Sequence, residues 1–395
     1  MSNMDEKPQA TVCGGEDATA HPNNADGSAN GPDGDANVPV ELITAREVPL
    51  GGPRAMTVRR TLPQRKRSMI GAWCFVDHYG PDDVSVSGGM DVAPHPHIGL
   101  QTVSWLFEGE IAHIDSGGHE GLVRPGEVNL MTSGAGICHS ETSTEGVKVL
   151  HGVQLWVALP DSARSTAPRG FEHYEPSEVE YDGGSALVFV GSLLGDESPV
   201  KSFTPLLGAE LRLNPGASVT LDVDATFEHG LLVDEGDVEL EGVAVPRAGI
   251  GYTGVGAESL EIRNVGDAPA RMVLLGGEPF AEEIVMWWNF VGRTSEEIAE
   301  AREAWQERQD LEKRGLEWEG LDADPEARAQ IDGNRFGLVK GYVGHGGENK
   351  NAVGRSWLPA PALPNGVIRA RQNPAPTARP DLPEPGSAPE TRSFR

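Results

Sequence analysis

Two short stretches of the chain carry side chains of the kind that bind metal ions. His95 and His97 stand one residue apart in PHPHIGLQTV, and His139 and Glu141 have the same spacing in GAGICHSETS. Residues i and i+2 of a β-strand point to the same face of a sheet. If both stretches are strands, each presents two ligand side chains side by side, and together they could close around one ion.

Three neutral imidazoles and one carboxylate make a mixed nitrogen and oxygen ligand set. Such a set suits Fe, Mn, Co, Ni, Cu or Zn, whereas Ca²⁺ and Mg²⁺ prefer shells of oxygen alone. If the ion takes six ligands, four protein ligands leave two positions for water, dioxygen or a chelating substrate, as in a reactive metal site. The alternative is that these are ordinary polar residues on the solvent-facing side of a strand.

Other polar residues are expected to have lesser roles. Gln101 shares the strand parity of the first histidine pair, so a hydrogen bond to a ligand or substrate is open to it. Cys138 points away from the second pair, and we expect it to pack in the core. Structural or exposed roles are expected for five histidines that lie near turns, in an apolar strand, or without a partner two residues away: His113, His119, His151, His173 and His229.

The elements that must position the two pairs are predicted to be short strands. Residues 102–115, 147–159 and 186–194 are rich in β-forming residues and are separated by Gly, Pro and Asp turn signals. This pattern favours an antiparallel sandwich or barrel over alternating βα units. A second strand-rich block covers about 203–277, and its VDEGDVELEG is spaced like LFEGEIAHID in the first block, which suggests an internal duplication.

One helix is expected to interrupt the strands, at 294–315. Thr294 and Glu297 have the spacing of a capping box at its start, and Gly315 can end it. An apolar stripe along this helix should pack on the barrels. The residues of the stripe are Ile298, Ala301 and Trp305.

Composition bounds the class of protein. The chain has 395 residues and a net charge of −28, which argues against nucleic acid as a partner. No run of about 18 apolar residues is present to cross a membrane. Three scattered cysteines and the absence of a secretory signal fit a cytoplasmic location. Residues 1–38 are read as a disordered leader and residues 372–395 as a Pro-rich tail.

Residues 60–81, 94–141 and 151–160 resemble the pirin family, which belongs to the cupin superfamily of small β-barrels, and residues 287–298 and 335–364 look like the closing segments of that family. The resemblance covers most of 40–370 and is most specific between Pro94 and Glu141. It implies an all-β fold of two cupin-type antiparallel β-barrels, a bicupin, with a C-terminal helix and disordered tails. The implied parts are a metal-binding cupin at 39–175, a cupin lacking metal ligands at 183–290, the helix at 294–315, and an extended segment packed on the barrels at 335–371.

The resemblance also implies the ligands of the site. Pirins hold one iron-type metal in the first barrel through three histidines and a glutamate, which correspond to His95, His97, His139 and Glu141 here. Many cupins place a carboxylate ligand shortly after the histidine pair, where this chain offers only Gln101. A neutral amide is a poor ligand for this class of ion, so Glu141 must supply the negative charge.

Two functions follow from the resemblance. Some pirins resemble quercetin 2,3-dioxygenases, which implies metal-dependent ring cleavage of a flavonol by dioxygen, with Glu141 as the general base. Other pirins resemble redox sensors, in which a change between Fe(II) and Fe(III) alters the surface offered to a protein partner. A third alternative is a metal that only stabilises the barrel. We therefore expect a monomer that binds one divalent ion, most readily iron, with Mn, Ni, Co, Cu or Zn as alternatives. The expected partner is either a small aromatic substrate with dioxygen or another protein. Binding to nucleic acid or to a membrane is not expected.

Overall fold

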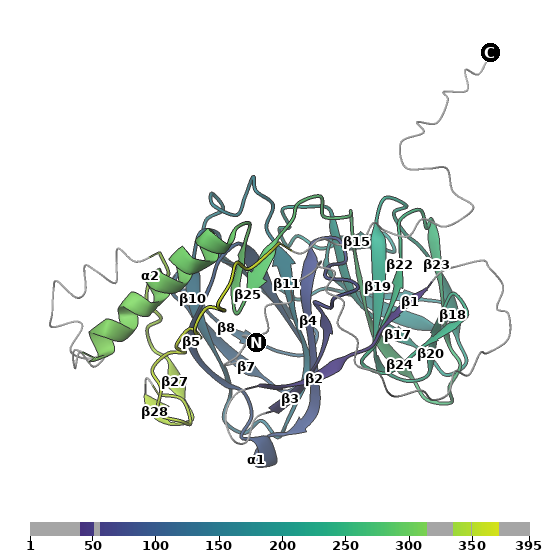
Figure 1. Ribbon diagram of the computed structural model, residues 1–395. Helices are drawn as coiled ribbons and strands as arrows, with labels where there is room; N and C mark the ends of the chain where they lie inside the picture. Colours follow the sequence, from purple (N-terminus) through teal and green to yellow (C-terminus); the bar gives the residue numbers. More distant parts are fainter. Residues whose placement is uncertain (1–39, 51–55, 314–334, 349, 371–395) are drawn as a thin grey trace, which may run out of the picture.

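The computed structural model of the protein describes residues 40–50, 56–313, 335–348 and 350–370. Strands dominate these residues, and every pairing within the four large sheets is antiparallel. The expected all-β fold of two cupin-type barrels is confirmed (Figure 1). The expected leader at 1–38, the tail at 372–395 and Gly315 lie outside the described residues. Among the helices that are described, none is long and apolar enough to cross a membrane.

The first barrel consists of a seven-stranded sheet that faces a four-stranded sheet. In spatial order, the larger sheet contains β12 (Gly170–Tyr174), β9 (Val128–Thr132), β6 (Leu100–Glu108), β11 (Val149–Ala158), β4 (Trp73–Asp83), β3 (Met56–Leu62) and β2 (Arg46–Leu50). The smaller sheet contains β5 (Asp91–His97), β10 (Ile137–Ser143), β7 (Ile111–Asp115) and β8 (Glu120–Val123). A short helix, α1 (Val84–Ser87), follows β4.

The second barrel has the same division into seven and four strands. Its larger sheet contains β1 (Glu41–Ile43), β22 (Ile250–Thr253), β19 (Glu228–Glu235), β24 (Ala270–Gly277), β17 (Leu206–Leu213), β14 (Gly184–Val190) and β13 (Glu178–Tyr181). Its smaller sheet contains β18 (Ser218–Asp222), β23 (Ser259–Asn264), β20 (Val238–Leu240) and β21 (Val243–Val245). Three two-stranded ribbons complete the strands: β15 (Ser192–Leu193) with β16 (Asp196–Glu197), β25 (Val285–Trp287) with β26 (Phe290–Gly292), and β27 (Val343–Gly344) with β28 (Gly347–Glu348).

The two similar Glu-Gly segments occupy the same place in the two barrels. One follows β6 and leads into β7, and the other follows β19 and leads into β20. In each case the chain leaves the larger sheet and enters the smaller one. Gly109 has φ +99° and Gly236 has φ +90°, a backbone conformation that favours glycine. The sequence similarity therefore marks a turn that both barrels need.

The two barrels lie side by side and share one apolar core (Figure 1). Residues of β6 and β11 pack against residues of β19 and β24 from the other barrel. Tryptophans of the first barrel also donate hydrogen bonds across this interface. Trp105 Nε1 lies 2.7 Å from Glu210 Oε2, and Trp73 Nε1 lies 3.0 Å from the carbonyl oxygen of Leu207. Their polar atoms are satisfied, so both indoles are buried without an unpaired donor.

The predicted boundaries between the barrels differ from the structure at three points. The strand β1, assigned to the first barrel, pairs with β22 of the second. The strand β13 begins before residue 183 and pairs with β14. The β25–β26 ribbon, assigned mostly to the second barrel, contacts the first, where Val291 N donates to the carbonyl oxygen of Ile98 at 3.1 Å. These exchanges depend on long-range pairing, which composition does not record.

The predicted helix is α2 (Ser295–Lys313), and it covers the outer side of the first barrel (Figure 1). Thr294 Oγ1 accepts from Glu297 N at 3.1 Å, as the capping-box spacing predicts. The Glu297 carboxylate accepts the returning bond from Arg293 N, one residue earlier than in a standard box. All three residues of the predicted apolar stripe are buried.

The segment that follows α2 lies along the first barrel. Its residues 335–348 and 350–370 place Phe336 against Phe290 and bury Trp357 and Leu358. Leu358 N donates to the carbonyl oxygen of Pro94 at 2.9 Å, so this segment covers the edge of β5. Leu358 also accepts a hydrogen bond of 2.7 Å from Trp305 Nε1. Trp305 thereby joins α2, the C-terminal segment and the barrel.

Trp305→Ala should lower the free energy of unfolding by about 3–5 kcal/mol, because it removes a fully buried indole and its hydrogen bond. Urea unfolding followed by circular dichroism measures the change. Glu303→Ala, an exposed position on the same helix, is the control and should shift the midpoint little. An unchanged midpoint for Trp305→Ala would contradict the role of this residue as an anchor.

Candidate metal centre

Strands β5 and β10 pair directly and bring the two predicted stretches together. Their register places His139 opposite His95 and Cys138 opposite Pro96. Proline has no N–H to donate, so it is tolerated in a sheet mainly on edge strands, and β5 is the edge strand of its sheet. The alternation of Pro and His in β5 therefore directs the two prolines to one face and the two imidazoles to the other.

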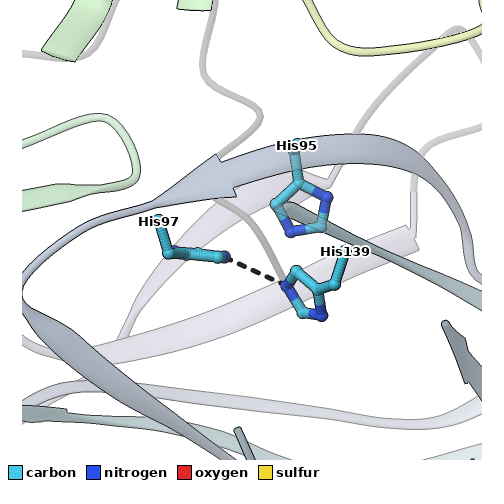
Figure 2. A group of neighbouring side chains, drawn as sticks. All are labelled: His95, His97 and His139. Carbon is cyan, nitrogen blue, oxygen red and sulfur yellow. Dashed lines mark hydrogen bonds between the residues drawn. The ribbon is translucent and has the colours of Figure 1, made fainter. Parts of the chain in front are cut away.

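Three imidazoles meet inside the first barrel (Figure 2). His95, His97 and His139 each offer a ring nitrogen, and these three atoms all lie within 4.8 Å of one another. The ring centroids are 4.3 Å apart for His95 and His139, and 5.0 Å apart for each of the other pairs. All three side chains are buried. The two stretches selected from the sequence thus supply one compact cluster.

Backbone carbonyls fix the protonation of two of these rings. His95 Nδ1 donates to the carbonyl oxygen of Ala93 at 3.0 Å, and His97 Nδ1 donates to that of Asn289 at 3.2 Å. A neutral imidazole that carries its proton on Nδ1 has a lone pair on Nε2. Both Nε2 atoms are therefore ready to act as metal ligands.

The two Nε2 lone pairs of His95 and His97 converge with a ring nitrogen of His139 in one buried space. His97 Nε2 lies only 3.1 Å from His139 Nε2, and His95 Nε2 has no hydrogen-bond partner among the residues that the structure describes. Unprotonated nitrogens that converge in a buried space repel one another unless a positive charge lies between them. The residues present fit a transition-metal ion.

Burial keeps these imidazoles neutral. It lowers the pKa of His95 to about 4, although the nearby Glu141 carboxylate raises it. Burial also lowers the pKa of His97 and of His139 well below the ordinary value. Because metal binding requires the neutral ring, the cluster is in its binding form at pH 7.

Glu141 lies on the same strand as His139 but does not belong to the tight cluster. The register between β10 and β5 shifts between these two residues, and Glu141 is opposite Val92. Its side chain is buried, yet its carboxylate oxygens are not within 4.8 Å of all three histidine nitrogens. The predicted ligand role of Glu141 stays a prediction.

Tyr79 is a polar neighbour that the sequence did not identify. Its hydroxyl is buried and has no hydrogen-bond partner among the described residues. Burial raises the pKa of Tyr79 well above its ordinary value, and the charge of Glu141 raises it further. The phenol thus stays protonated and offers a donor near Glu141.

Two expectations about neighbours have different outcomes. Cys138 packs among apolar residues and donates to the carbonyl oxygen of Gly337, so its predicted core position is confirmed. Gln101 was expected on the strand of the histidine pair. It lies on β6 of the other sheet instead, because the chain turns at Gly99. Gly99 has φ +67°, and a Cβ there would lie 2.1 Å from the carbonyl oxygen of Val291. The Gln101 amide donates to Thr132 and Lys201 instead.

Two of the five histidines that were expected to have structural or exposed roles lie beside or within a buried cluster. His113 lies within β7 rather than near a turn, and its Nδ1 is 3.1 Å from Nδ1 of His139. His151 joins a second buried cluster. His119 and His173 are partly exposed and hydrogen-bonded to neighbours, and His229 is buried in the second barrel. Only pairing between distant strands places His113 and His151, so spacing along the chain could not find them.

The second cluster consists of His78, His151 and Asp234, and it joins the two barrels. Asp234 Oδ1 accepts from His78 Nε2 at 2.7 Å and from His151 Nε2 at 2.6 Å. Its Oδ2 accepts from Arg271 Nε at 2.6 Å. In the first cluster, three histidine nitrogens lie within 4.8 Å of one another. In the second cluster, hydrogen-bond donors of the protein already occupy the carboxylate of Asp234. This arrangement is a buried ion-pair network rather than a set of converging lone pairs.

The metal-free protein should lose stability as the pH falls from about 6.5 toward 4. In this range the unfolded chain binds protons at His95, whose folded pKa is about 4, and the folded protein does not. The loss from His95 alone should be about 2 kcal/mol at pH 5 relative to pH 7. Urea unfolding of the chelator-treated protein measures it, and His95→Gln should reduce the difference. Equal stability at both pH values would contradict neutral burial.

Asp234→Asn should lower the free energy of unfolding by about 3 kcal/mol, because Arg271 loses its buried counter-charge. Glu239→Gln, which breaks an exposed pair with Arg263, is the control and should cost less than about 1 kcal/mol. Metal content per chain should be the same in both variants. Loss of an ion from Asp234→Asn would identify the second cluster as a metal site and contradict its assignment as an ion-pair network.

Comparison with known proteins agrees with this architecture. The family model for pirin matches residues 55–157, and the model for the pirin C-terminal cupin domain matches residues 208–310. A Pseudomonas aeruginosa protein named "Putative quercetin 2,3-dioxygenase" is 44% identical over 268 residues, which are 68% of this chain and 84% of that protein. A Pirin-like protein of Caulobacter vibrioides is 35% identical over 273 residues, or 67% of this chain and 92% of that protein.

A solved structure extends the similarity to three dimensions. The crystal structure of quercetin 2,3-dioxygenase from Acinetobacter baumannii matches with a TM-score of 0.70 and 36% sequence identity, covering 84% of this chain and 98% of that one. The two family models match in chain order, one on each barrel, and the curated relatives are matched over most of their length. The chain belongs to the pirin family.

Proposed function

We propose that this protein is a metal-dependent dioxygenase that cleaves the ring of a flavonol, and that four buried residues hold its metal. The observation that carries the proposal is the convergence of three buried imidazole rings inside the first barrel, two of which have a lone pair on Nε2. The proposed ligands are His95, His97, His139 and Glu141. Glu141 completes the set as the charged member, which requires its side chain to approach the cluster more closely than it does here.

The substrate class follows from the relatives. The Pseudomonas protein is named "Putative quercetin 2,3-dioxygenase", and the Acinetobacter structure is that of a quercetin 2,3-dioxygenase. Their similarity to this chain extends over both barrels, so the proposed substrate is a flavonol such as quercetin. The mixed ligand set suits iron, and also Mn, Ni, Co, Cu or Zn.

The residues of the chain have separable roles. A bound ion would supply the Lewis acidity that favours the anionic form of the flavonol 3-hydroxyl. Glu141 would accept the proton of that hydroxyl as a general base. Tyr79, which stays protonated, offers a hydrogen-bond donor beside Glu141. Burial of the three histidines excludes bulk water from the reacting groups.

Wild-type protein loaded with iron, manganese or nickel should consume quercetin and dioxygen at least about 100-fold faster than His139→Ala, because the variant lacks one of the proposed ligands. Loss of the flavonol absorbance and oxygen uptake measure the rate, and elemental analysis measures the metal in each sample. His173→Ala, a partly exposed histidine that bonds Asn129, is the matched control and should keep the wild-type rate. If no metal form exceeds His139→Ala, the proposal fails.

The same samples test the two alternatives from the sequence. A protein captured from lysate in only one iron oxidation state, together with no turnover, would favour a redox-sensing regulator. A large fall in melting temperature on chelation, with neither turnover nor a partner, would favour a metal that only stabilises the barrel.

A further inference from the structure

His139 differs from His95 and His97 in the group that its Nδ1 atom contacts. Backbone carbonyls accept from Nδ1 of His95 and His97. His139 Nδ1 instead lies 3.1 Å from another ring nitrogen, Nδ1 of His113. A ring nitrogen can be either donor or acceptor, so this contact alone does not decide where the proton of His139 lies.

A hydrogen-bonded chain continues from His113. Its Nε2 lies 3.4 Å from Asp115 Oδ2, a long hydrogen bond. Asp115 Oδ1 accepts from Gly117 N at 2.7 Å and from His119 N at 3.1 Å, and both carboxylate oxygens lie 3.1 Å from His119 Nδ1. The β7–β10 register places Asp115 opposite His139. The carboxylate is thus held firmly on the neighbouring strand.

With an ionised Asp115 and neutral imidazoles, the carboxylate determines the proton positions in the chain. Asp115 only accepts, so His113 must carry its proton on Nε2 and have a lone pair on Nδ1. That lone pair accepts from His139 Nδ1, and His139 then has its own lone pair on Nε2. We propose that His113 and Asp115 are positioning residues that hold His139 in the tautomer whose Nε2 binds the metal.

Packing fixes the ring that transmits this preference. His113 is buried, and Phe171 stacks on it with ring centroids 4.6 Å apart and planes 24° apart. The ring of His113 is therefore held against rotation, and its two nitrogens stay directed at His139 and Asp115. The inference rests on the metal-binding part of the proposed function and not on the reaction with a flavonol.

Asp115→Asn is the sharpest test, because it keeps the shape and reverses the chain. The amide oxygen should take the place of Oδ1, which accepts from the backbone of Gly117 and His119. The amide nitrogen then faces His113 and donates to its Nε2. His113 donates to His139 in turn, so the proton of His139 moves to Nε2, where it blocks the metal. The dissociation constant for Co²⁺ should rise about 10- to 100-fold.

Two further variants complete the set. His113→Phe keeps an aromatic ring against Phe171 but removes both nitrogens, and it should weaken Co²⁺ binding to a similar extent. His119→Ala is the matched control. It leaves the carboxylate of Asp115 ionised and bonded to the backbone, so the dissociation constant should change less than about threefold. Thermal melting of each metal-free variant checks that it is folded.

Two readouts keep the outcome separate from the proposed activity. The first is Co²⁺ titration of the full chain, followed by visible absorption and chelator competition. The second is ¹⁵N NMR of histidine in the metal-free protein, which distinguishes protonated from unprotonated ring nitrogens, with His139→Gln for assignment. We expect His139 to carry its proton on Nδ1 in the wild type and on Nε2 in Asp115→Asn.

Wild-type affinity in both Asp115→Asn and His113→Phe would overturn the inference, as would a wild-type His139 protonated on Nε2. A wild-type chain that binds no Co²⁺ would count against the proposed function. In that case the NMR measurement on the metal-free protein still decides the tautomer of His139.

Discussion

Three imidazole nitrogens converge at one buried point in the first barrel. Their convergence determines which hydrogen-bond acceptors the surrounding strands must supply. The pairing of β5 with β10 brings the rings together, and His97 Nε2 lies 3.1 Å from His139 Nε2, so lone pairs on both nitrogens would repel one another. A cation relieves this repulsion, and the surrounding protein supplies an acceptor for each Nδ1 that keeps Nε2 available. The fold can be understood as the means of holding these acceptors in place.

Segments that follow the first barrel in the sequence contribute contacts to its buried histidines. In the described parts of the chain, the ribbon β25–β26 brings the carbonyl oxygen of Asn289 to His97. Asp234 of β19, in the second barrel, accepts hydrogen bonds from His78 and His151 of the first barrel. The shared apolar core and these polar contacts restrict movement between the barrels. The ribbon β25–β26 therefore helps to orient His97, and the second barrel helps to orient His78 and His151.

Much of the candidate site could be predicted from the sequence because its proposed ligands come in pairs on two strands. The i, i+2 spacing places His95 with His97 by local geometry alone. The fold followed from the resemblance of the long central stretch. Contacts between distant strands were not predictable: His113 reaches His139 through the β7–β10 register, and Asp234 reaches His78 across the two barrels. Gln101 was misplaced because the turn at Gly99, where a Cβ would clash with the backbone of Val291, is not visible in the local pattern.

We propose that the histidine cluster binds a single divalent ion. A crystal structure with anomalous diffraction measured at the absorption edge of the bound metal tests it most directly. We expect one anomalous peak about 2.0–2.1 Å from Nε2 of each of His95, His97 and His139. A metal-replete crystal with no peak at these nitrogens, or with a peak only between His78, His151 and Asp234, would contradict it.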